Sequence, residues 1–124
     1  MATKLYESKE IVNDGLICSL NPPVEAFFVT IRALGAVKTL KRGTVLALSS
    51  SDNKMVVLGN GDATANCILC DDTVVGTEDV KAMAYRHGHF AVEKLTVADG
   101  YTMTAADKEE LREVGILLSN AVEA

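Results

Sequence analysis

After residue 23, the chain is a succession of short apolar runs separated by turn residues. Phe27, Val29 and Ile31 are spaced by two, and successive side chains of a strand point to opposite faces, so this stretch predicts a half-buried strand. We predict further short strands at residues 44–48, 54–58, 67–70, 80–85 and 90–97. This order favours a mainly β domain of the α+β type, such as a sandwich, a barrel or a clip, over a parallel α/β sheet.

One short helix is predicted near the C-terminus. Thr104 is a suitable N-cap, Asp107 stands near the positive end of the helix dipole, and Gly115 suits the position after the last turn. Leu111 and Val114 are three residues apart, and we expect both to face the core. Residues 116–118 are then expected to form a last buried strand.

The pattern divides the chain into an N-terminal arm, residues 1–22, and a domain, residues 23–124. The pair Pro22-Pro23 supplies no backbone donors and favours extended geometry, so it separates the two parts. We expect the arm to be extended and poorly ordered in isolation; the alternative is a hairpin that turns at residues 13–15 and packs on the core. The arm residues expected to contact a partner are Ile11, Val12, Leu16, Ile17, Pro22 and Pro23.

Composition and charge narrow the class of partner. The chain has 124 residues, of which 48% are hydrophobic and 23% charged, which is typical of one folded globular domain. A formal net charge of -5 argues against a nucleic acid or an anionic membrane as the main partner. No apolar run reaches the ~18 residues of a membrane helix, and the first residues are too polar for a signal-peptide core. We therefore expect synthesis in a cytoplasm and a protein or small-molecule partner.

The cysteines are the first candidates for chemistry. Cys18, Cys67 and Cys70 form an odd set without an export signal, so we expect reduced thiols. The Cys67-x-x-Cys70 spacing occurs in redox motifs and in half zinc sites. Here the pair brackets two aliphatic residues of a predicted strand, not a helix N-terminus, and strand geometry points the two side chains to opposite faces. We interpret them as buried small residues.

Two histidines are the second candidates. His87 and His89 would share one face of a strand, a spacing that a metal can use, with Cys18 or Asp71 as conceivable third ligands. Nothing in the sequence brings a third ligand close, so we expect two exposed histidines at a strand end, which could make an interface sensitive to pH. The chain also lacks the common nucleophile, phosphate-loop and zinc-protease motifs. We expect no catalytic residues, no metal and no cofactor.

The order of several segments resembles the lambda-type phage head decoration proteins, the protein D family. The segments that carry the resemblance are Pro22-Pro23-Val24, Leu40-Lys41-Arg42-Gly43-Thr44-Val45-Leu46, Ile68-Leu69 with Asp71-Asp72, Ala84-Tyr85-Arg86-His87-Gly88-His89-Phe90, Thr104-Ala105-Ala106-Asp107 with Leu111, and Gly115-Ile116-Leu117-Leu118. The ordered set is much more specific than any one member. The two histidines depart from the family pattern, in which a Gly-Glu-Phe-like segment is expected.

The resemblance implies a small β-clip-like domain that binds the outer surface of the expanded phage head. Homotrimers would sit at local threefold positions of the virion and contact the major capsid protein, with the N-terminal arm reaching toward the shell. No nucleic acid or membrane would be bound. One alternative is a non-viral β-clip binding module for a carbohydrate or protein partner. Another is a metal or redox protein that uses the cysteines and histidines named above.

Overall fold

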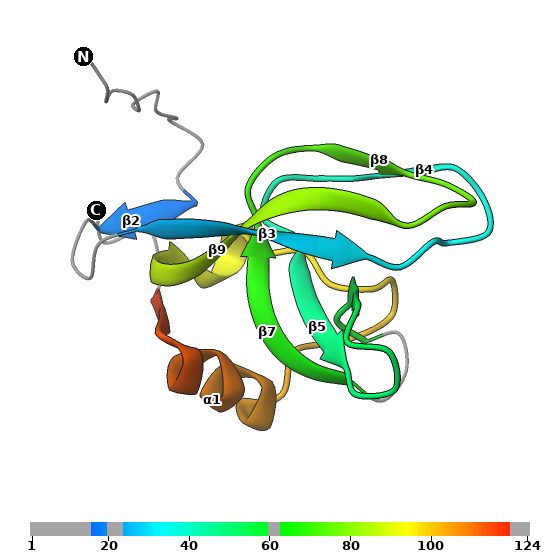
Figure 1. The fold of residues 1–124 in the computed structure, drawn as a ribbon. Helices are drawn as coiled ribbons and strands as arrows, with labels where there is room; N and C mark the ends of the chain where they lie inside the picture. Colours follow the sequence, from blue (N-terminus) through cyan, green and yellow to red (C-terminus); the bar gives the residue numbers. More distant parts are fainter. Residues whose placement is uncertain (1–15, 20–23, 60–62, 120–124) are drawn as a thin grey trace, which may run out of the picture.

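The computed structural model describes residues 16–19, 24–59 and 63–119. Their strands are β2 (Ile17–Ser19), β3 (Glu25–Ile31), β4 (Lys38–Leu40), β5 (Val45–Ser49), β6 (Met55–Val57), β7 (Ala63–Leu69), β8 (Thr73–Val75), β9 (Val80–Ala91) and β10 (Ile116–Ser119) (Figure 1). A 3-10 turn, η1 (Val92–Lys94), follows β9, and the α-helix α1 (Ala105–Val114) precedes β10. The prediction of a small, mainly β domain with one short C-terminal helix is confirmed.

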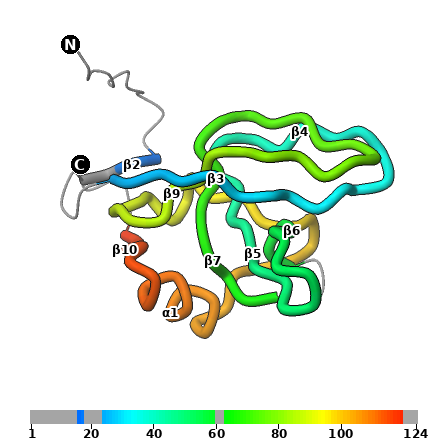
Figure 2. Tube along the Cα trace, in the orientation of Figure 1, coloured from blue at the N-terminus to red at the C-terminus, as the bar shows by residue number. Residues whose placement is uncertain are grey.

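Five strands pair in a closed ring. β9 pairs with β3 on one side and with β7 on the other, β7 pairs with β5, and β5 pairs with β6. The ring closes where β6 meets β3 in parallel, through Ile31 and Met55. Figure 2 shows the path of β5, β6 and β7 through the middle of the molecule. Closure removes the open edges that a small sheet would otherwise expose.

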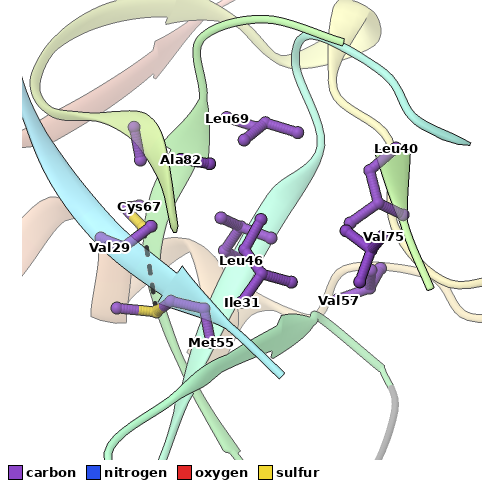
Figure 3. Close-up of a cluster of buried hydrophobic side chains, with 11 residues drawn as sticks. Val29, Ile31, Leu40, Leu46, Met55, Val57, Cys67, Leu69, Val75 and Ala82 are labelled. Atoms are coloured by element: carbon purple, nitrogen blue, oxygen red, sulfur yellow. Dashed lines mark hydrogen bonds between the residues drawn. The ribbon is translucent and has the colours of Figure 1, made fainter. Parts of the chain in front are cut away.

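The other four described strands lie outside this ring. β2 and β10 flank residues 88–91 at the end of β9, β2 in antiparallel and β10 in parallel orientation. β4 and β8 form a separate two-stranded sheet, which we call the flap. The flap lies beside the first half of β9 (Figure 1). Its inward residues Leu40 and Val75 are buried in the same cluster as Ile31 of β3 (Figure 3).

The strand period of two divides the buried side chains into two clusters. The inner cluster consists of Val29, Ile31, Leu40, Leu46, Met55, Val57, Cys67, Leu69, Val75, Ala82 and Ala84. The outer cluster, toward α1 and β10, consists of Leu16, Val45, Ala47, Val56, Leu58, Ala65, Ile68, Phe90, Leu111 and Ile116. Consecutive residues of β5 and β6 alternate between the clusters because both faces of these strands are covered. This double burial explains why the two strands read as uninterrupted apolar runs.

A β-bulge in β7 changes which side of the strand its side chains point to. Leu46 pairs with Cys67 and Ala47 pairs with Ala65, so Asn66 is the extra residue. Regular alternation would place Ala65 and Cys67 on the same face, but the bulge sends the first to the outer cluster and the second to the inner cluster. β7 also begins earlier than the predicted 67–70, because residues 63–65 pair with β5. β4 and β8, of three residues each, were not predicted.

The prediction for β9 needs correction. We expected one strand to stop near residues 86–89 and another to cover residues 90–97, but β9 is continuous over Val80–Ala91 and η1 follows it. The strand continues because it exchanges partners: β3 pairs with it as far as His87, and β2 and β10 take over from Gly88. A Cβ on Gly88 would lie 2.8 Å from the Phe90 ring, so glycine is required where that ring folds back.

The helix begins and ends as predicted, but its buried face differs. Thr104 and Asp107 form a reciprocal capping box, and Gly115 ends the helix with φ of 107°. Leu111 is fully buried, whereas Val114 is 38% exposed, so the prediction that both face the core is wrong for Val114. The buried stripe runs through Asp107 and Leu111, and its next position is Gly115, after which β10 continues into the core.

β10 is only partly buried, so the prediction of a buried strand at residues 116–118 is wrong in part. Ile116 is buried in the outer cluster, but Leu117 is exposed and Leu118 is half-buried. In the described residues, β10 pairs with β9 alone, so it lies at the border of the sheet. The β-clip topology expected from the resemblance stays a prediction.

Candidate docking and self-association surfaces

Two classes of site can be assessed directly on the residues that the structure describes. Those residues contain no group of three or more His, Cys, Asp or Glu side chains placed to hold a metal ion. Over the same ranges, none of the helices has the length and apolar character needed to span a bilayer.

The two described cysteines are buried thiols, as predicted. Cys67 belongs to the inner cluster, and its thiol donates to the sulfur of Met55 at 4.0 Å (Figure 3). Burial raises the pKa of the Cys67 thiol to about 12. Burial, followed by the charge of Asp71, raises the pKa of Cys70 to about 12 as well. Such thiols are protonated at neutral pH, which is the opposite of a redox-active cysteine. The side chain of Cys18 lies outside the described residues.

The histidines are partly buried and each has a partner, so the prediction of two simply exposed histidines is wrong. Nδ1 of His87 lies 2.8 Å from a carboxylate oxygen of Glu25 on β3. Nε2 of His89 shares a 2.8 Å hydrogen bond with the hydroxyl of Ser119 on β10. The two rings thus bind residues of different neighbouring strands. Asp71, the conceivable third ligand, is exposed after β7.

Only residues 16–19 of the predicted arm are described. Leu16 is 1% exposed in the outer cluster, and its carbonyl accepts a 2.8 Å hydrogen bond from the amide of Ala91. Ile17 of β2 pairs with Phe90 of β9. Both residues therefore pack on the domain in this structure. The other arm residues singled out by the sequence lie outside the described residues: Ile11, Val12, Pro22 and Pro23. Binding of the arm to a partner stays a prediction.

Exposed apolar side chains gather on one lobe of the molecule, formed by β3, the first half of β9 and the flap. The large exposed residues of the lobe are Phe28, Val37, Val74 and Met83. In the alternation along β3, Phe28 lies on the face opposite Val29 and Ile31, but this pattern gives no reason to assign a function to it. Val37 and Val74 were missed because the flap strands were too short to predict.

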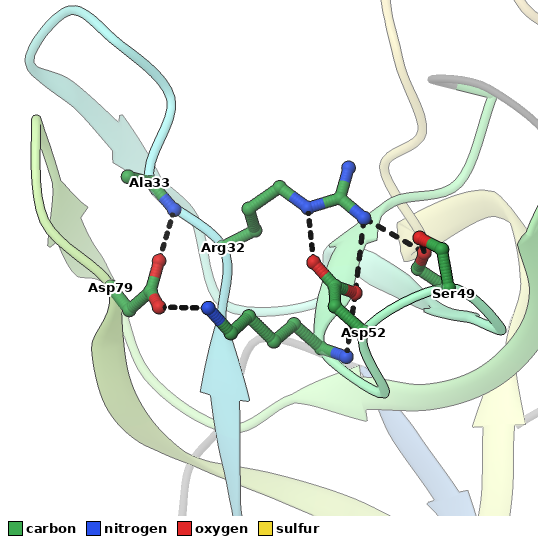
Figure 4. A network of polar contacts seen from close by, with 7 residues as sticks. Arg32, Ala33, Ser49, Asp52 and Asp79 are labelled. Atoms are coloured by element: carbon green, nitrogen blue, oxygen red, sulfur yellow. Dashed lines mark hydrogen bonds and ion pairs between the residues drawn. The ribbon is translucent and has the colours of Figure 1, made fainter.

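A polar network links the end of β3 and the turn before β9 to the β5–β6 turn (Figure 4). Two nitrogens of Arg32 donate to the carboxylate of Asp52, at 3.0 and 3.1 Å. The carboxylate of Asp79 accepts from the amide of Ala33 at 2.9 Å and from the ammonium of Lys54. These bonds connect the end of β3, the β5–β6 turn and the turn before β9. The guanidinium hydrogen bond is the main cause that lowers the pKa of Asp52 to about 2.

Comparison with known families agrees with the resemblance seen in the sequence. The family model described as "Bacteriophage lambda head decoration protein D" matches residues 6–117. No curated protein matches the chain. The match extends over most of the chain, including the ring, the flap and α1. The chain therefore belongs to the bacteriophage lambda head decoration protein D family, whose members are structural proteins of the phage head.

Proposed function

We propose that this protein binds the outer surface of the expanded phage head as homotrimers at local threefold positions and stabilises the shell. The observation that carries the proposal is the family match over residues 6–117. The family supports a role at the phage capsid, and the trimer, the threefold position and the outer surface are parts of the proposal. The match gives no support to the alternative of a non-viral binding module.

Residues 16–19 of the arm are attached to the domain. Leu16 is inserted in the outer cluster and β2 pairs with β9, so a pull on the preceding residues is transmitted to the core. We propose that the arm before Leu16, with Ile11 and Val12, adds as an extended strand to an edge of the major capsid protein. Three arms on one trimer would bind with high effective concentration, and many weak contacts would then reinforce the lattice.

Co-sedimentation with capsids tests the decoration role. The purified protein is mixed with expanded, undecorated capsids of its own phage, with unexpanded procapsids as the control. We expect saturable binding to the expanded form alone, at one trimer for each local threefold position. Absence of binding to both forms would overturn the proposal.

A truncation tests the arm separately, and the structure determines where to cut. Removal of residues 1–15 leaves Leu16 and β2 in place, whereas a longer deletion would also damage the outer cluster. The matched control is Ile11→Ala with Val12→Ala in the full chain, which keeps the length of the arm. We expect both variants to keep the stability of the domain and to lose capsid affinity. A truncated protein that binds as tightly as the full chain would remove the arm from the account.

A further inference from the structure

α1 and β10 lie side by side at one end of the molecule (Figure 2), and both line an open hollow of about 400 Å³. Lys108, Glu109 and Arg112 of α1 line one side of this hollow, and residues 116–118 of β10 line the other. His89 of β9 completes the lining. None of these residues belongs to β3, to the first half of β9 or to the flap, so the hollow is separate from the apolar lobe.

The β10 side of the hollow presents an exposed leucine. Leu117 pairs with His89 in the parallel ladder between β10 and β9, so the two side chains share one face of the sheet. The 2.8 Å hydrogen bond between Nε2 of His89 and the hydroxyl of Ser119 holds the ring at this face. Leu117 is 38% exposed, although the residues on either side of it pack into the outer cluster. A bound partner could therefore bury this side chain.

The α1 side of the hollow has an excess of positive charge. Lys108 and Arg112 are four residues apart, so both lie on one side of the helix. Glu109 accepts a hydrogen bond from Nε of Arg112 at 2.8 Å, whereas Lys108 forms no ion pair within the described residues. Glu110 and Glu113 of the same helix do not line the hollow. One positive charge is thus left uncompensated in a chain of net charge -5, and an acidic partner would complement it.

The root of the arm lies close to this hollow. β2 and β10 flank the same residues of β9, and neighbouring strands are about 4.8 Å apart, so β2 and β10 are separated by about 10 Å. Ala91 donates its amide to the carbonyl of Leu16, the first described residue of the arm, and pairs with Ser119 at the end of β10. A partner that is bound by the arm just before Leu16 is therefore within reach of the hollow.

We propose that the hollow between α1 and β10 binds an extended, acidic segment of the major capsid protein. This inference rests on the proposed function, in which the arm binds that protein, and adds a second contact in which the domain accepts a segment of the shell. The segment lies along β10, covers Leu117 and places a carboxylate beside Lys108. An extended segment suits the site because, in the described part of the chain, β10 pairs with β9 alone and can accept a further strand. The arm and the hollow then hold the shell protein from both sides of β9.

Charge reversal tests the electrostatic part of this contact. Lys108→Glu is compared with Lys94→Glu, which makes the same change of charge at an exposed residue outside the hollow. A glutamate near the N-terminus of α1 is compatible with the helix dipole, so the fold should survive, and circular dichroism with a thermal melt verifies this. In co-sedimentation with expanded capsids at about 0.05 M salt, we expect Lys108→Glu to bind at least about fivefold more weakly than the control, and the difference to shrink at about 0.5 M salt. Equal binding of the two variants would overturn the inference.

Photo-crosslinking identifies what occupies the hollow. Leu117→p-benzoylphenylalanine carries the reactive group into the hollow, and Lys94→p-benzoylphenylalanine is the matched control; each protein is irradiated on expanded capsids. We expect position 117 alone to cross-link to the major capsid protein, and mass spectrometry to find a cross-linked peptide that contains Asp or Glu. Cross-links that stay within the chain or join two copies of it, a shell peptide without acidic residues, equal cross-linking from both positions, or no cross-link at all would each count against the inference.

The wild-type protein separates this inference from the proposed function. Wild type that binds expanded capsids, together with a Lys108→Glu variant that matches its control and no cross-link from position 117 to the shell, would leave the decoration role intact and remove the second contact. Wild type that does not bind expanded capsids would overturn both.

Discussion

Replacing Leu16 by alanine tests whether the root of the arm is part of the folded domain. Leu16 is 1% exposed, and its methyl groups lie near Gly43, where a Cβ would be 3.6 Å from one of them. The change removes three carbons, which at about 0.8 kcal/mol for each buried methylene is about 2.4 kcal/mol of transfer free energy. Buried leucine-to-alanine changes cost about 2–5 kcal/mol once the cavity is included. Because β2 has three residues and can relax, we expect about 2–3 kcal/mol.

Urea denaturation of wild type and Leu16→Ala measures this loss as a shift of the midpoint at constant slope. Ile17→Ala is the matched control, because Ile17 is the next residue and is only partly buried. We expect the control to lose less than half as much stability. A Leu16→Ala protein within about 0.5 kcal/mol of wild type would refute the reasoning, because a change of that size is typical of an exposed site. The loosely attached arm would then extend through β2, and Leu16 would not anchor it to the domain.

Three other predictions follow from the structure. The pKa of Asp52 is lowered from 3.8 to about 2 in the folded protein, so its ionised carboxylate stabilises the fold above pH 3.8. This stability is lost as the pH falls toward 2. Asp52→Asn should therefore make the stability of the protein depend less on pH in this window, as measured by acid denaturation followed by circular dichroism. Cys67 and Cys70 should resist a thiol reagent in the native state and react after unfolding in urea, whereas fast native labelling of either would contradict their burial. Gly115→Ala should cost more than about 1 kcal/mol in urea denaturation, because φ is 107° and a Cβ would lie 2.6 Å from a ring carbon of His87; a neutral result would contradict this geometry.

The helix ends and the half-buried strand β3 could be predicted because their signals are local. Thr104, Asp107 and Gly115 act through backbone groups a few residues away, and the alternation at Phe27–Ile31 directly reflects one covered face. The length of β9 could not be predicted, because it depends on strands that replace β3 after His87. In the sequence, Gly88 suggests the end of a strand, but in the fold β9 continues through it.

The exposed surfaces and the attachment of the arm were harder to predict from the sequence than the fold. The flap depends on β4 and β8, which are too short to produce a pattern and are held through Leu40 and Val75 in the inner cluster. Leu16 was assigned to the arm because Pro22-Pro23 suggested a boundary after it. Its burial depends on the distant Phe90 and Ala91, with which β2 is associated. Tertiary contacts of this kind leave no periodic signal near the residue concerned.

Binding of the full-length protein to expanded capsids of its own phage, measured by co-sedimentation against unexpanded procapsids, tests the central claim most directly. We predict saturation on expanded capsids at one trimer for each local threefold position, and no binding to procapsids. Equal binding to both forms, or binding to neither, would contradict the proposed role.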